Sequence, residues 1–82
     1  MHADICDPED SEAIECFKTA LKRLGAEKID QSWGLGVDLL SLQIGTETLR
    51  VFSDTWSIDI EGPDQLVQNV LALFNQLKGE NT

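Results

Sequence analysis

Basic residues are scarce in this 82-residue chain, and their scarcity limits the partners that the protein can attract. Six Lys and Arg stand against fifteen Asp and Glu, which gives a formal net charge of -9 at pH 7. A chain with this charge repels phosphate backbones and anionic lipid headgroups. We therefore expect no nucleic-acid partner and no membrane partner.

Histidine and cysteine are scarce as well, and this argues against catalysis. His2 is the single histidine and lies in a segment, residues 1–6, that we expect to be frayed, so a Ser-His-Asp set would lack an oriented base. Cys6 and Cys16 are too few for a disulfide scaffold and form no C-x-x-C pair, so we expect two reduced thiols. Nearby carboxylates oppose a Cys6 thiolate, and Cys16 is expected to be a packing residue. We expect no enzyme.

Long apolar runs are also lacking. No stretch approaches the roughly 20 apolar residues that cross a bilayer, and the first residues lack the pattern of a secretory signal, so we expect a cytoplasmic protein. Hydrophobic residues nevertheless make up 41% of the chain, which suffices for a packed core. We expect a single domain over residues 1–82, with a polar tail at 80–82.

Acidic residues are abundant near the start of the chain. Six carboxylates precede the first base, Lys18. The unpaired N–H groups and the dipole at the start of a helix favour such charge. The same negative field could dock a basic partner, and the sequence leaves both interpretations open. The six residues are Asp4, Asp7, Glu9, Asp10, Glu12 and Glu15.

Apolar residues at helical spacing predict two helices. The first spans residues 8–24, with Asp7 as the N-cap, Pro8 in the first helical position and Gly25 as a left-handed stop. The second lies between Pro63 and Gly79. The apolar stripes are Ile14, Phe17, Leu21 and Leu24 in the first, and Leu66, Val67, Val70, Leu71, Phe74 and Leu77 in the second.

Between the two helices, the apolar period changes to two and predicts a meander of antiparallel strands. One face of this sheet is apolar and the other is mostly polar. Leu39 and Phe52 break the alternation, and they are predicted to point from the polar face unless a bulge shifts the register. The fold class is therefore an α+β two-layer sandwich of three or four strands, with both helices on one face. The predicted strands are residues 26–32, 37–44, 48–52 and 56–61.

Two motifs that suggest cofactor or metal chemistry are incomplete. The Gly34-Leu35-Gly36 turn resembles the start of a dinucleotide-binding loop, but Leu39 stands where the third glycine is needed. A second acidic group contains no ligand loop of the D-x-D-x-D-G type. We therefore expect no cofactor and no metal. The acidic group comprises Asp54, Asp59, Glu61 and Asp64.

Large apolar side chains and nearby carboxylates form the candidate site. Two of these apolar side chains also have an interpretation that involves no partner. Trp33 could cover the end of the sheet, and Trp56 could cap the core from inside. The leading hypothesis is a non-catalytic protein-binding domain, such as a small inhibitor, an immunity-type protein or an adaptor, that docks a basic partner. The candidate partner-binding residues are Trp33, Leu39, Phe52, Asp54, Trp56, Asp59 and Glu61.

Two alternatives remain. A homodimer could bury Leu39 and Phe52 across the open sheet face. A small enzyme or ligand-binding domain could use Trp33, Cys16 or the pair of Asp59 and Glu61. Such a domain would need a concave pocket beside these residues.

Overall fold

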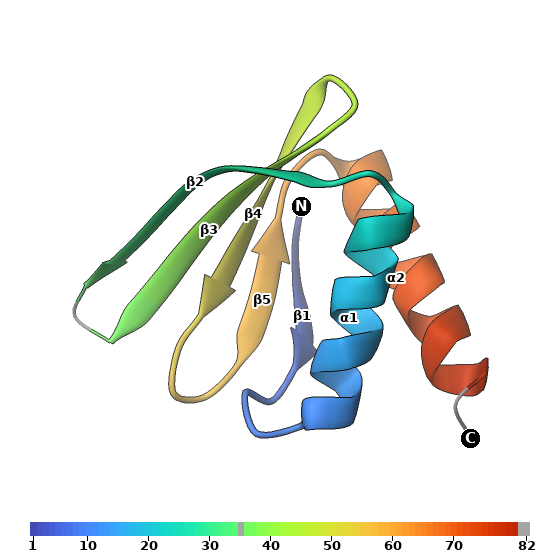
Figure 1. Ribbon diagram of the computed structural model, residues 1–82. Helices are drawn as coiled ribbons and strands as arrows, with labels where there is room; N and C mark the ends of the chain where they lie inside the picture. Colours follow the sequence, from blue (N-terminus) through green and yellow to red (C-terminus); the bar gives the residue numbers. More distant parts are fainter. Residues whose placement is uncertain (35, 81–82) are drawn as a thin grey trace.

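In the part of the chain that the structure describes, two helices and a five-stranded antiparallel sheet make up the fold (Figure 1). The computed structural model describes residues 1–34 and 36–80, without the side chains of Trp33 and Glu80. The sheet order is β1-β5-β4-β3-β2. In chain order, the elements are β1 (His2–Cys6), α1 (Ser11–Arg23), β2 (Glu27–Gly34), β3 (Val37–Ile44), β4 (Glu47–Ser53), β5 (Ile58–Glu61) and α2 (Asp64–Glu80).

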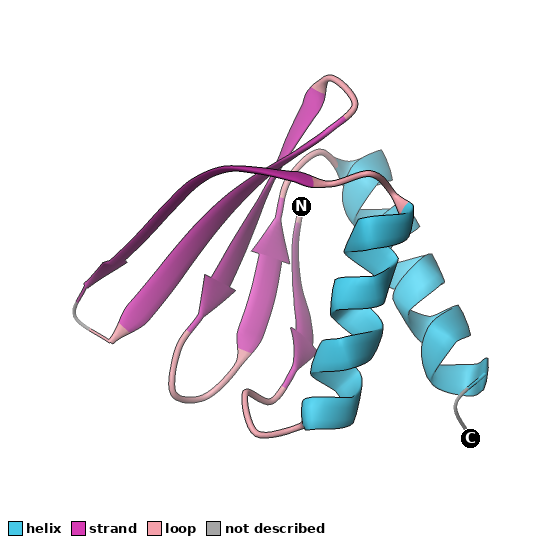
Figure 2. Ribbon diagram, in the orientation of Figure 1, coloured by secondary structure: helices cyan, strands magenta, loops and turns pink. Residues whose placement is uncertain are grey.

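The helices form one layer and the sheet forms the other (Figure 2). Figure 2 shows α1 and α2 next to each other on the same side of the sheet, and both helices contact β1. This is the α+β sandwich that the sequence predicts, because the apolar stripes of the helices and the apolar face of the sheet share one core.

The N-terminal segment corrects one sequence prediction. Residues 1–6 are not frayed, since His2–Cys6 form the edge strand β1, which pairs antiparallel with β5. The sheet therefore has five strands instead of three or four. Ile5 is 9% exposed and belongs to the core. Burial of this side chain, together with backbone hydrogen bonds to β5, holds the segment in place.

The start of α1 also differs from the prediction. Asp10 is the N-cap instead of Asp7, and its Oδ1 accepts a hydrogen bond from the backbone N–H of Ala13 at 3.1 Å. Asp7 and Pro8 lie in the turn after β1, where the carbonyl of Asp7 accepts from the N–H of Asp10. Both aspartates match the cap signature, but the chain needs the residues from Asp7 onward to reverse its direction after β1.

Several element ends move by a few residues. Gly25 has φ +76°, which confirms the left-handed stop after α1. Trp56 precedes β5 instead of belonging to it, and α2 continues through Gly79 to Glu80. Of the predicted polar tail, residues 81–82 lie outside the described residues, as does Leu35 of the glycine turn.

Neither α1 nor α2, the helices of the described residues, has the length and apolar character that a membrane span requires.

The buried side chains among the described residues form a single core cluster, to which both layers contribute. Cys16 is buried and belongs to it, as predicted for a packing residue, while Cys6 is half-buried. No disulfide joins Cys6 and Cys16 in the part of the chain that the structure describes. The fully buried side chains of largest volume are Leu49, Ile60, Val67 and Val70.

Candidate interaction surface

The sheet face that points away from the helices carries the two side chains that break the alternation. In the regular β3–β4 register, Leu39 lies opposite Phe52, and Leu40 lies opposite Val51. Val51 is buried on the helix side, so Phe52, the next residue, points to the other face. Leu39 and Phe52 are therefore neighbours on the uncovered face, where both are half-buried.

This pair continues into a row that crosses four strands. Phe52 in β4 lies opposite Asp59 in β5, and Asp59 lies opposite Asp4 in β1. One half of the row is apolar and the other half is acidic. In the adjacent row, Arg50 lies opposite Glu61, and Glu61 lies opposite His2. We call the surface formed by these two rows the open face.

His2 connects the acidic half of the open face to the apolar half. Its ring stacks on Phe52, with the ring centroids 6.2 Å apart and the planes at 29°. Its Nε2 lies 3.2 Å from Oδ2 of Asp59. These contacts orient the Phe52 ring beside a carboxylate, so the apolar group and the charge are presented together.

Among the acidic residues of the open face, Asp59 is the least exposed to solvent, since its side chain is 20% exposed. Burial acts to raise the pKa of Asp59. The nearby polar side chains of Ser57, His2 and Asp4, and the positive charge of a protonated His2, outweigh it and hold the pKa below its ordinary value. The open face therefore keeps a negative charge next to Phe52 at neutral pH.

Among the described residues, the group that could hold a metal ion lies in this cluster. His2, Asp4 and Asp59 each present one donor atom, and these atoms lie within 4.8 Å of one another. Of the acidic group that the sequence singled out, Asp59 is one of these donors, whereas Asp54 follows β4 and Asp64 begins α2. A nitrogen and two carboxylate oxygens suit a borderline divalent cation.

Sequence reasoning missed His2 and Asp4 as members of the site. The signal that could have found them is the period-two pattern of the first strand, in which these polar residues alternate with Ala3 and Ile5. The pattern is short, and the acidic residues that follow it look like the start of a helix.

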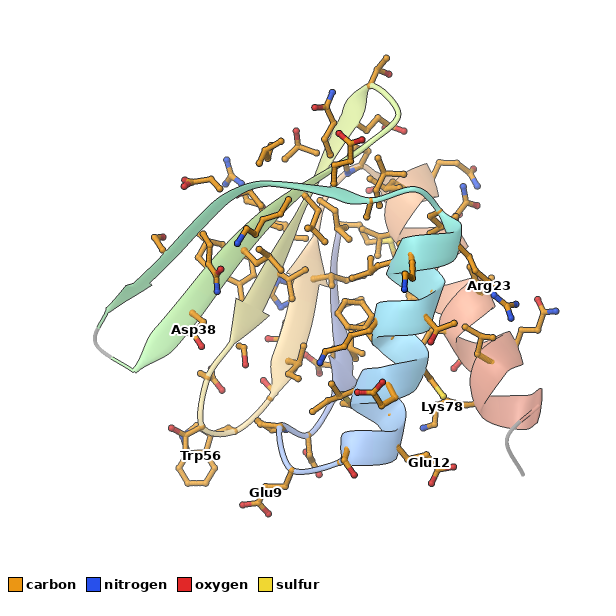
Figure 3. All side chains as sticks on the ribbon, in the orientation of Figure 1. Glu9, Glu12, Arg23, Asp38, Trp56 and Lys78 are labelled. Carbon is orange, nitrogen blue, oxygen red and sulfur yellow. The ribbon has the colours of Figure 1, made fainter. Side chains whose placement is uncertain are left out.

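Asp54 and Trp56 lie away from the open face, in the loop between β4 and β5. Oδ1 of Asp54 accepts hydrogen bonds from the N–H groups of Trp56 and Ser57, both at 2.8 Å, so this carboxylate shapes the loop. Trp56 is 82% exposed and projects outward near Glu9 (Figure 3). It does not cap the core from inside. Leu39, Phe52, Asp59 and Glu61 therefore lie on the open face, whereas Asp54 and Trp56 lie in this loop.

Two other residues from the sequence analysis, Trp33 and Cys6, lie in β2 and β1. Trp33 lies in β2 opposite Asp38, and its side chain lies outside the described part of the structure. The pKa of the Cys6 thiol is raised, first by burial and then by Asp10 and Asp7, against an opposing effect of Lys78. A raised thiol pKa disfavours the reactive thiolate.

Comparisons with known proteins give no relative. No protein-family model matches the chain, and no curated protein or solved structure is significantly similar to it.

Proposed function

We propose that the protein is a non-catalytic binding domain that docks a basic protein through its open face. The observation that carries this proposal is the placement of Phe52, a half-buried aromatic residue between Leu39 and Asp59 on a sheet face without helices. Aromatic residues that sit in a packed, partly desolvated setting contribute much of the energy of protein interfaces. Phe52 is thus the proposed anchor.

Charge supports the choice of partner. The chain carries a net charge of -9, and Asp4, Asp59 and Glu61 lie on the open face itself. A negative field of this size steers a basic protein toward the surface and repels acidic ones. The proposed class of protein is therefore a small inhibitor, an immunity-type protein or an adaptor.

A homodimer through the same face is the second candidate, because it would cover Leu39 and Phe52. The net charge disfavours it, since two copies would bring two negatively charged faces together. Sedimentation of wild type and Phe52→Asp decides between the two. A monomer in both cases removes the dimer, whereas a wild-type dimer that Phe52→Asp dissociates would replace the docking proposal.

To test the docking proposal, the wild-type protein and its variants are immobilised and exposed to a cell extract. The basic proteins that each of them retains are then compared. Phe52→Ser removes the anchor without adding charge, and Glu61→Lys reverses one charge on the open face. Glu47→Lys is the matched control, since Glu47 lies opposite Ile44 on the helix side of the sheet. The variants are compared at low and high ionic strength.

We expect the same partner to bind wild type and Glu47→Lys, and to be weakened about thirtyfold by Phe52→Ser. Binding should fall as ionic strength rises, because salt screens exposed charges. A partner that binds all four proteins equally, or equally well at low and high salt, would contradict the proposal.

A further inference from the structure

A second surface, on the helix side of the sheet, has the opposite charge character. A groove of about 370 Å³ lies between the C-terminal half of α1 and strands β2 and β3. Leu21, Ala26, Leu40 and Leu42 line it. Leu21 and Leu42 are buried, whereas Ala26 and Leu40 are half-buried and leave apolar surface within reach of a ligand.

Three lysines surround this apolar floor. Lys18, Lys22 and Lys28 line the groove, and they are half of the six basic residues in the chain. No carboxylate is among the described residues that line it. In a protein with a net charge of -9, this is a local reversal of charge over an apolar surface.

The lysine ammonium groups are accessible. Lys18 and Lys22 are four residues apart on α1 and so share one helix face, and Lys28 faces them from β2. Lys18 makes an exposed ion pair with Glu15 at 3.8 Å, and Lys28 donates to Gln31 at 3.3 Å. Exposed contacts of this kind exchange readily. The ammonium of Lys22 makes no ion pair or hydrogen bond with the described residues.

We propose that this groove binds a medium-chain aliphatic carboxylate such as octanoate or decanoate. The hydrocarbon chain would lie on the leucine floor, and the carboxylate would lie among the three lysines. Inorganic anions would leave the floor uncovered, neutral lipids would leave the lysines unused, and nucleic acids would be repelled by the protein as a whole. The site goes beyond the proposed docking function and lies on the other side of the sheet.

The test is a nuclear magnetic resonance titration with acetate, octanoate, decanoate and octanol, each below its aggregation concentration. We expect no measurable binding of acetate and weaker binding of octanol than of octanoate. From octanoate to decanoate, the affinity should rise about two- to fourfold for each added methylene. The amide signals that move should be those of Ala26, Lys28, Leu40 and Leu42.

Two adjacent residues of α1 provide a matched pair of variants. Lys22→Glu and Arg23→Glu change the net charge equally and lie in the same last turn, but Lys22 lines the groove. Figure 3 shows Arg23 projecting from the side of α1 on which α2 lies. We expect Lys22→Glu to weaken decanoate binding about three- to tenfold and Arg23→Glu to change it less than about twofold.

Three outcomes would overturn the proposal. These are similar affinities for acetate and decanoate, equal effects of Lys22→Glu and Arg23→Glu, and amide shifts that map outside the groove. Phe52→Ser should leave decanoate binding unchanged, so failure of this site and failure of the docking function are distinguishable. The variant Leu40→Ala should reduce the gain from each added methylene while the protein stays folded.

Discussion

Phe17 and Phe74 meet edge to face between α1 and α2, with their ring centroids 6.3 Å apart and their planes at 90°. Both side chains are almost fully buried, and Nζ of Lys78 lies 5.4 Å from the centre of the Phe74 ring. This contact joins the two helices, which are far apart in sequence. It therefore couples the first half of the chain to the last.

The Phe17–Phe74 contact predicts a measurable coupling. In a double-mutant cycle with Phe17→Leu and Phe74→Leu, we expect an interaction energy of about 0.5–1.5 kcal/mol beyond the lost burial. Urea unfolding of the four proteins measures it. Additive effects of the two substitutions would show that the geometry of the rings contributes nothing.

The edge strand β1 predicts a large effect for one isoleucine. Ile5 is buried at 9% exposure, whereas Ile29 in β2 is 52% exposed. We expect Ile5→Ala to lower the free energy of unfolding by about 2–4 kcal/mol, and Ile29→Ala by less than about 1 kcal/mol. Urea unfolding compares the two. Equal effects would mean that Ile5 is not packed in the core as its place in β1 requires.

The cap of α1 predicts a difference between two aspartates. Asp10→Ala removes the hydrogen bond to the N–H of Ala13 and should cost about 1 kcal/mol of stability. Asp7→Ala removes the same charge, but from the preceding turn, and should cost less than about 0.5 kcal/mol. Thermal unfolding of both variants checks this. A larger loss for Asp7→Ala would restore Asp7 as the cap.

Asp59 predicts a dependence of stability on acidity. Because its pKa is lower in the folded protein than the ordinary value of about 3.9, its charged form adds stability above that pH. The contribution is lost as the pH falls through the folded pKa. The stability difference between wild type and Asp59→Asn should therefore shrink below about pH 4. Urea unfolding between neutral and acidic pH measures it, and a difference that stays constant would contradict the prediction.

The raised pKa of Cys6 predicts slow alkylation. Iodoacetamide reacts with the thiolate, so Cys6 in the folded protein should react more slowly at neutral pH than Cys6 in urea-unfolded protein. Its reaction rate should rise at a higher pH than the ordinary cysteine pKa of about 8.5. Mass spectrometry of the Cys6 peptide follows the modification. Reaction at equal rates in both states would show that burial does not protect the thiol.

The sequence predicts the helices and the middle strands because their apolar spacing is long and regular. The helix stop at Gly25 follows from the residue type. The two faces of β3 and β4 follow from the alternation of apolar and polar residues along each strand. The strand β1 could not be predicted in the same way, because its alternation covers a few residues and only Ile5 is strongly apolar. Asp10 was missed as the cap because Asp7, followed by Pro8, fits the same signature.

The candidate surfaces could likewise be predicted from the sequence only in part. The positions of Leu39 and Phe52 on the open face follow from strand parity, which is a property of each strand. The contact between His2 and Asp59 joins residues that are 57 positions apart, so it requires the register of β1 on β5. In the sequence, nothing distinguishes Lys22 and Lys28 from other solvated residues. The fold brings them to one groove because β2 lies beside α1.

The pairing of β1 with β5 sets an order of events during synthesis. The segment around Ile5 is synthesised before its partner strand β5, which follows roughly 3 to 11 seconds later at ordinary rates of translation. Until then, the nascent strand lacks the neighbour that it has in the folded sheet, and the charges of Asp4 and Asp7 oppose its association with other chains. We therefore expect the acidic residues next to β1 to lower the tendency of the incomplete chain to aggregate.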